Sequence, residues 1–144
     1  MRNIVLLATG ALASLLVQAQ EYAPYEDAAI TLHQWETYHN AVKACCEATR
    51  REYKDRGLVT YAKDEGRLGY TFTLENHPAH PAWITREVIP GADIQMQLIG
   101  YYAGSEEEFA KLYESYDKLT DQMVKMIRAR TSAQKAQQDT APKP

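Results

Sequence analysis

The chain has 144 residues and a formal net charge of −3, from 16 Lys and Arg residues against 19 Asp and Glu residues. This balance provides no basic surface to attract a phosphate backbone, which argues against a nucleic-acid-binding role. The length beyond residue 19 fits one domain of ordinary size with its own hydrophobic core.

The first nineteen residues are typical of a cleavable secretory signal peptide. Arg2 precedes an apolar run from Ile4 to Val17, which is shorter than the ~20 residues that a membrane-spanning helix needs. Val17 and Ala19 occupy the −3 and −1 positions of a peptidase site. No cysteine follows the run to accept a lipid. We therefore predict cleavage after Ala19 and export to the periplasm or the cell exterior, with no membrane span in the remaining chain.

An amphipathic helix is predicted from residue 26 to residue 56. Its apolar positions recur three or four residues apart, as an amphipathic helix requires, and they are Ala28, Leu32, Trp35, Tyr38, Val42 and Cys45. Gly57 follows at the position where a helix-ending residue in a left-handed conformation is expected.

The next segment changes to strand-like periodicity. Four strands are predicted over residues 58–62, 67–75, 82–89 and 94–102, with turns at 63–66 and 90–93. The loop 76–81 between the second and third strands contains Pro78 and Pro81, which exclude a central strand there. Glutamines alternate with apolar residues in the last strand, which favours a sheet with one largely solvated face.

A second helix begins after Ser105, which forms a capping-box pattern with Glu108. Its apolar residues keep helical spacing as far as Met126, whereas residues 131–144 have no apolar period, so we predict a disordered tail there. The predicted fold class is α+β: an N-terminal helix, a four-stranded antiparallel meander and a C-terminal helix. Both helices would cover one face of the sheet as a two-layer sandwich, in a single domain over residues 20–130.

The two cysteines, Cys45 and Cys46, are adjacent. A bridge between neighbours closes a very small ring and needs a backbone that a helix interior does not offer. We therefore expect two buried thiols acting as small apolar side chains. An intermolecular disulfide that makes a homodimer through Cys45 or Cys46 is the main alternative.

A metal site is the second functional hypothesis. His77 and His80 form an H-x-x-H pair in the proline-containing loop, and Glu75 could supply a third ligand. The competing interpretation is a rigid turn in which the prolines matter more than the histidines. No cofactor is otherwise predicted.

No catalytic motif is found in the sequence, which argues against an enzyme. Tyrosine is abundant, with 10 copies, and it combines an apolar ring with a polar tip that suits binding sites. The preferred hypothesis is an exported, non-enzymatic binding protein that holds a protein partner or a small apolar ligand. Its candidate contact residues are Tyr70, Tyr101, Tyr102, Tyr113 and Tyr116. The competing interpretation is that the tyrosines build an ordinary core in place of phenylalanine.

Overall fold

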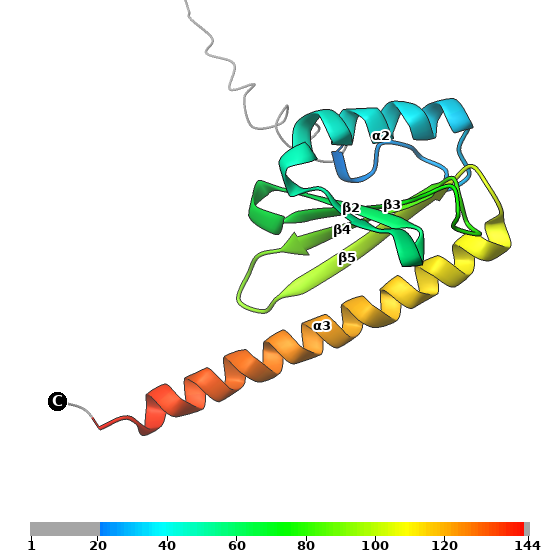
Figure 1. Cartoon of the computed structure of the whole chain (residues 1–144). Coiled ribbons are helices and arrows are strands. Elements are labelled where there is room, and N and C mark those ends of the chain that lie inside the picture. Colours follow the sequence, from blue (N-terminus) through cyan, green and yellow to red (C-terminus); the bar gives the residue numbers. More distant parts are fainter. Residues whose placement is uncertain (1–20, 143–144) are drawn as a thin grey trace, which may run out of the picture.

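The computed structural model describes residues 21–142, and the predicted signal peptide lies outside this range. A five-stranded antiparallel sheet lies between two helices, α2 (Leu32–Cys46) on one face and α3 (Glu106–Thr140) on the other (Figure 1). The α+β class predicted from the sequence is therefore confirmed. None of the helices in the described range combines the length and the apolar composition that a membrane span requires.

The sheet is a simple meander in which every strand pairs with its sequence neighbours. Its strands are β1 (Arg51–Tyr53), β2 (Leu58–Lys63), β3 (Leu68–Thr73), β4 (Ala82–Ile89) and β5 (Gln95–Tyr102). Short 3₁₀ turns η1 (Glu47–Thr49), η2 (Lys54–Arg56) and η3 (Asp64–Gly66) connect the early elements. The last four strands correspond to the four that were predicted, and β1 is an addition, so the prediction of a four-stranded sheet was wrong by one strand.

α2 begins with a capping box and ends earlier than predicted. The Thr31 hydroxyl accepts a hydrogen bond from the Gln34 amide, and the Gln34 side chain accepts one from the Thr31 amide. Helix α2 ends at Cys46, whose φ of −131° leaves the helical region, rather than at Arg56. The Thr49 hydroxyl then bonds both backbone groups of Ala62, and residues 51–53 pair with β2. Sheet pairing thus prevails over the helix-forming residues of this segment.

The face of the sheet under α2 carries an aromatic core. Trp35 and Tyr38 of α2 pack on Phe72 and Trp83, with the Tyr38 and Trp83 rings stacked 4.4 Å apart. Phe72 and Trp83 are fully buried. Each such aromatic ring removes a large apolar area from water, so this cluster supplies much of the hydrophobic stabilisation of the fold.

The opposite face packs on the first half of α3. Ile84 and Leu58 meet Phe109 and Leu112 of the helix. Gly100 of β5 allows Phe109 to lie close against the sheet, because a Cβ at that position would lie 2.6 Å from the Phe109 ring. The helices therefore cover opposite faces and make three layers, and the predicted two-layer sandwich was wrong. Four consecutive residues of β4, 82–85, are buried, as expected of a strand covered on both sides.

The chain before α2 extends the edge of the sheet. Ala29 forms a parallel bridge with Tyr102. The Ile30 amide donates to the Tyr102 carbonyl and the Tyr102 amide donates to the Ala28 carbonyl, both at 2.9 Å. This segment also brings Tyr25 onto Tyr101, whose hydroxyl donates to the Tyr25 carbonyl at 2.9 Å.

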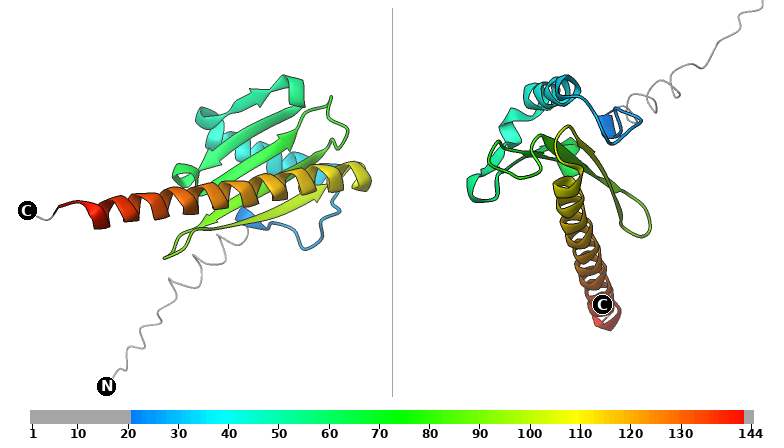
Figure 2. Two further views of the ribbon diagram at one scale, coloured as in Figure 1. Left: turned by 90° about the horizontal axis from the view of Figure 1, so that it is seen from below. Right: turned by 90° about the vertical axis from the view of Figure 1, so that its right-hand side faces the viewer.

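The second half of α3 projects beyond the sheet (Figure 2). Arg128 anchors it to the β4–β5 turn through Asp93 and the Ile94 carbonyl. Residues 129–142 are exposed, and α3 continues to Thr140 through the segment predicted as a disordered tail. Ala, Gln and Lys are strong helix formers, which explains how this segment continues the helix without packing on the sheet.

Candidate functional site

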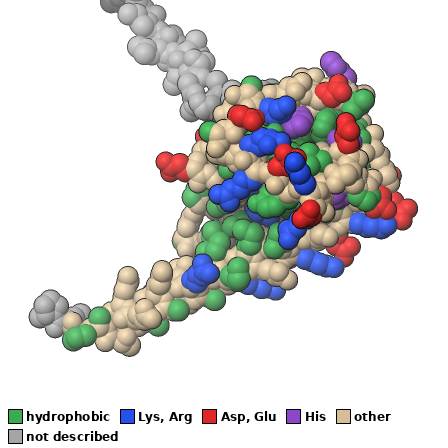
Figure 3. Space-filling view, viewed as in Figure 1, with side chains coloured by type: hydrophobic (Ala, Val, Ile, Leu, Met, Phe, Trp, Pro, Cys, Tyr) green, Lys and Arg blue, Asp and Glu red, His purple; other side chains and the backbone are tan. Residues whose placement is uncertain are grey.

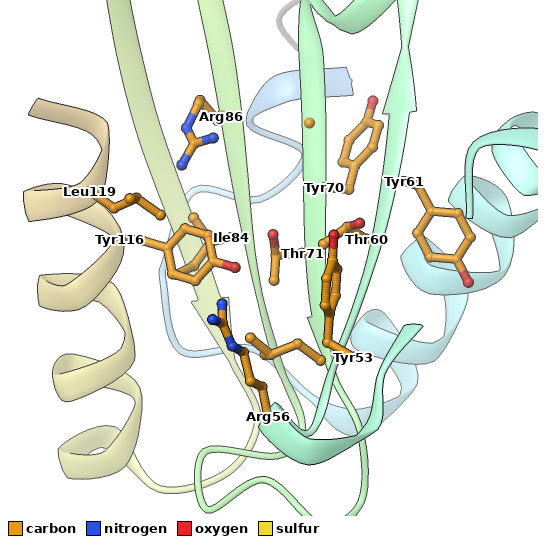
Figure 4. Close-up of a pocket in the computed structure, with 12 residues that line it drawn as sticks. Tyr53, Arg56, Thr60, Tyr61, Tyr70, Thr71, Ile84, Arg86, Tyr116 and Leu119 are labelled. Carbon is orange, nitrogen blue, oxygen red and sulfur yellow. The ribbon is translucent and has the colours of Figure 1, made fainter. Parts of the chain in front are cut away.

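A pocket of about 330 Å³ opens beside α3 on the face of the sheet opposite α2. The first half of α3 packs on residues of β4 and β5, and the part of this face formed by β1, β2 and β3 is left less covered. The pocket is lined by Tyr53, Arg56, Leu58, Thr60, Tyr61, Gly69, Tyr70, Thr71, Ile84, Arg86, Tyr116 and Leu119 (Figure 4). In Figure 3, hydrophobic side chains gather where α3 runs below the sheet, with Lys and Arg side chains around them.

Two walls and a floor form the pocket. Tyr116 and Leu119 of α3 make one wall, and Tyr53 with Arg56 makes the other. Gly57 permits the tight connection between η2 and β2, because its φ of +66° is a left-handed conformation that favours glycine. Gly69 lies on the floor, where its lack of a side chain leaves open space: a Cβ there would meet no atom within 4 Å.

The only charged residues among those that line the pocket are two arginines, Arg56 and Arg86. The Arg86 Nε donates to the Thr120 hydroxyl at 3.1 Å, and its guanidinium lies 5.8 Å from the centroid of the Tyr116 ring. One terminal nitrogen of Arg86 is buried without a hydrogen-bond partner. Burial lowers the pKa of Arg86, although a guanidinium stays protonated in proteins.

Neither pocket arginine forms a salt bridge within the described part of the chain. Other arginines are paired: Arg67 with Asp64 at 2.7 Å and Glu87 at 2.8 Å, and Arg50 with Glu52 at 2.7 Å. The lack of carboxylate partners thus distinguishes the two arginines of the pocket from these neighbours.

The structure separates the five tyrosines named from the sequence. Tyr70 and Tyr101 belong to the core under α2, and burial raises the pKa of Tyr70 to about 12. On the other face, Tyr102 stacks on Phe109 with the ring centroids 4.9 Å apart, and the Tyr113 hydroxyl donates to the Leu98 carbonyl at 3.2 Å. Tyr116 lines the pocket on the α3 side. Tyr70 is also a lining residue, but its ring packs against Tyr38 in the core.

The three residues of the metal hypothesis do not form a cluster. Among residues 21–142, no group of three or more His, Cys, Asp or Glu side chains is arranged to hold a metal ion. The His80 Nδ1 lies 3.0 Å from the Thr73 carbonyl oxygen, an acceptor, so this nitrogen is the donor. The His77 Nδ1 accepts a hydrogen bond from the Ala79 amide at 3.0 Å. Each histidine thus has one ring nitrogen engaged in holding the loop, and Glu75 is exposed.

Cys45 and Cys46 form a disulfide with each other, contrary to the expectation of two separate thiols. The pair lies at the end of α2, where the backbone of Cys46 is no longer helical, so the objection based on a helix interior does not apply. Neither cysteine is free, and the bridge leaves no thiol for the intermolecular disulfide that was considered.

Sequence reasoning missed Arg56, Gly69, Arg86 and Leu119 as pocket residues. The sequence contained one signal for Arg86. It lies on the same strand face as Ala82 and Ile84, so it is a charged residue on an otherwise apolar face. Tyr53 and Arg56 were assigned to the first helix, because no glycine or proline precedes Gly57 in that segment.

No protein-family model matches this chain, and the searches of curated proteins and of solved structures returned no significant match. The function is therefore inferred from the geometry and charge of the pocket itself.

Proposed function

We propose that this protein is an exported, non-enzymatic binding protein that holds a small ligand in the pocket between the sheet and α3. The observation that carries the proposal is the pocket. Residues from four segments, 53–61, 69–71, 84–86 and 116–119, line it, and Gly69 lies on its floor. Its volume of about 330 Å³ is at the lower end of the range for small-molecule sites.

The lining suits a ligand with an apolar body. Leu58, Ile84 and Leu119 provide aliphatic surface, and Tyr53 and Tyr116 provide aromatic rings at the walls. Tyr53 and Leu119 are 41% and 45% exposed, so these apolar groups remain accessible to a ligand. Burying them against a ligand would remove apolar surface from water and so favour binding.

Export is part of the same proposal. Its basis is the signal-peptide pattern of residues 1–19, and the Cys45–Cys46 bridge supports it because disulfides persist mainly in oxidising compartments. Intact-mass measurement of the protein recovered outside the cytoplasm tests this part. A chain that begins at Gln20 is expected, and a protein that retains residues 1–19 in the cytoplasm would contradict it.

Filling the pocket tests the binding function. Gly69→Phe adds a ring where the structure leaves open space above the floor, so it should block the pocket with little effect on folding. Gly91→Phe adds the same ring in the exposed β4–β5 turn and is the matched control. The probe is the neutral dye N-phenyl-1-naphthylamine, followed by its fluorescence on titration with the purified protein.

We expect the wild type and Gly91→Phe to bind the dye equally well. Gly69→Phe should weaken binding about tenfold or more, because the ring occupies the volume that the dye needs. Thermal unfolding by circular dichroism checks that both variants fold. Equal dye binding by both variants would reject the pocket as the binding site.

A further inference from the structure

An unpaired cation in a partly buried site costs free energy. Arg86 lies between β4 and α3, where it loses hydration, and its only hydrogen-bond acceptor among residues 21–142 is the neutral hydroxyl of Thr120. A buried N–H group without an acceptor destabilises the folded state, and more so when it is charged. The favourable contact with the Tyr116 ring offsets part of this cost but accepts no hydrogen bond.

A second cation lies at the same pocket. Arg56, on η2, is exposed and forms no salt bridge in the described chain. Figure 4 shows the guanidinium groups of Arg56 and Arg86 directed toward the Tyr116 ring from opposite sides. Two cations at one pocket repel each other, and no lining carboxylate screens them.

The remaining polar groups of the pocket are hydroxyls. Thr60 and Thr71 lie on the floor, and Tyr53 and Tyr116 contribute phenol groups at the walls. Hydroxyl and guanidinium groups can all donate hydrogen bonds, and the guanidinium fork matches the two oxygens of a carboxylate or phosphate. The site is therefore rich in donors and positive in charge.

We infer that the ligand carries an anionic oxygen group, a carboxylate, sulfonate or phosphate, which binds to Arg86 and Arg56 while an apolar body packs on Tyr116, Leu119 and Tyr53. This inference rests on the proposed function and specifies the chemical class of its ligand. The anion compensates the charge of the partly buried Arg86 guanidinium and reduces the repulsion between the two cations.

The geometry favours a small molecule over a macromolecular anion. Arg86 is partly buried below the pocket opening, flanked by Thr120 and Tyr116 of α3. A single oxyanion on a small body can reach it, whereas the regularly spaced charges of a nucleic acid would need a row of exposed cations. The overall charge of −3 also opposes the approach of a polyanion.

Two dyes with one skeleton test the inference. The dye 8-anilinonaphthalene-1-sulfonate carries a sulfonate on the ring system of neutral N-phenyl-1-naphthylamine, so their affinity ratio isolates the contribution of the anion. The purified full chain is titrated with each dye at low and high salt. The variants are Arg86→Met, which keeps the apolar stem, and Arg56→Gln, with Arg130→Gln as the control for net charge. Arg130 is exposed on α3, roughly 20 Å beyond Tyr116 at the helical rise per residue.

We expect the wild type to bind the sulfonate dye about tenfold or more tightly than the neutral dye, because charge-assisted hydrogen bonds are the stronger kind. High salt should reduce this ratio. Arg86→Met should remove most of the difference and leave neutral-dye affinity within about twofold, and Arg56→Gln should act in the same direction. Arg130→Gln should behave as the wild type. If Arg86→Met fails to fold, Arg56→Gln, whose side chain is exposed, decides the result.

Equal affinity of the wild type for the two dyes would overturn the inference while leaving the proposed function intact, provided that Gly69→Phe still blocks the neutral dye. Sulfonate binding that survives Gly69→Phe would also overturn it, because the anion would then bind elsewhere on the surface. Failure of both dyes to bind would reject the proposed function and the inference together.

Discussion

His39 is a titratable residue held within the aromatic core. Its ring stacks on Phe72 with the centroids 4.4 Å apart and lies 4.9 Å from the Trp35 ring. Its Nε2 is buried without a hydrogen-bond partner. Burial, with smaller contributions from Lys43, His80 and Arg50, lowers the pKa of His39 to about 4. The folded protein therefore holds the neutral imidazole at pH values where the unfolded chain is already protonated.

This environment predicts a loss of stability in acid. Below pH 6.5 the unfolded state takes up a proton that folded His39 does not, so the free energy of unfolding falls as the pH decreases toward 4. Between pH 7 and pH 5 we expect the His39 contribution to fall by about 1 kcal/mol, after allowance for the partial exposure of the ring. Urea unfolding of the wild type and His39→Phe at both pH values measures it.

The free energy of unfolding of His39→Phe should decrease less between pH 7 and pH 5 than that of the wild type. The control is His33→Phe, at an exposed position of α2, which should show the same decrease as the wild type. Parallel decreases in the wild type and His39→Phe would show that His39 does not cause the acid sensitivity.

Single residues of the pocket were the hardest feature to predict. A tyrosine excess indicates large amphipathic side chains but does not specify which face of a strand is buried under which helix. Tyr70 and Tyr101 therefore proved to be core residues, whereas Tyr116 lines the pocket. Arg86 becomes informative only when Thr120 and Tyr116 of α3 are known to flank it.

At the scale of elements, the end of α2 combines a helix terminus with the Cys45–Cys46 bridge. Cys45 is exposed, and Cys46, buried, packs in the core under the helix. The bridge closes so short a loop that it removes little freedom from the unfolded chain. Its contribution to stability should therefore be small.

We predict that mild reduction lowers the free energy of unfolding by about 1 kcal/mol or less. Without reductant, the protein should show no reactive thiol under denaturing conditions and a single monomer band on non-reducing electrophoresis. Thiol titration, electrophoresis and urea unfolding with and without a phosphine reductant measure these quantities. A dimer band that reductant removes would contradict the intrachain bridge and restore the disulfide-linked dimer.

Strands with strict alternation were predicted well, and helix limits were not. The alternating segment predicted as a strand at 67–75 contains β3, because Leu68, Tyr70 and Phe72 all face the core under α2. The strand predicted at 82–89 is β4 as observed. The first helix was predicted too long, because the first glycine or proline after residue 26 is Gly57, and nothing before it marks the end of the helix at Cys46. The extent of α3 was predicted too short, because apolar periodicity reports packing and this segment is helical without packing.

At the scale of the whole molecule, the sequence indicated one sheet with two helices but not their distribution between the faces. The choice depends on which strand face each helix meets, and both faces of β4 are apolar enough to be covered. Placing α3 opposite α2 leaves the pocket on the same face as α3. The pocket therefore follows from the layer arrangement, and a two-layer model of the chain does not contain it.

The ends of the sheet are also a property of the whole molecule. β1 is an edge strand of three residues, and residues 28–30 bridge part of the edge of β5. Short or covered edges limit strand-to-strand association. Ile30→Pro removes the amide that donates to Tyr102, so we predict more self-association and a lower melting temperature than for Ile30→Val, which keeps the donor. Size-exclusion chromatography over a range of concentrations measures the association, and a monomeric Ile30→Pro protein would contradict the role given to this segment.

The β-bridge and hydrogen bonds between the N-terminal segment and β5 also constrain the order of folding. Tyr25 and Tyr101 are separated by 76 residues, yet they bond each other in the core under α2. During synthesis, the N-terminal segment emerges first and must remain undocked until β5 has followed it. Contacts at such separation form late and slow folding. The aromatic core thus closes only when most of the domain has emerged. Under the proposed export, this delay would keep the chain unfolded while it crosses the membrane.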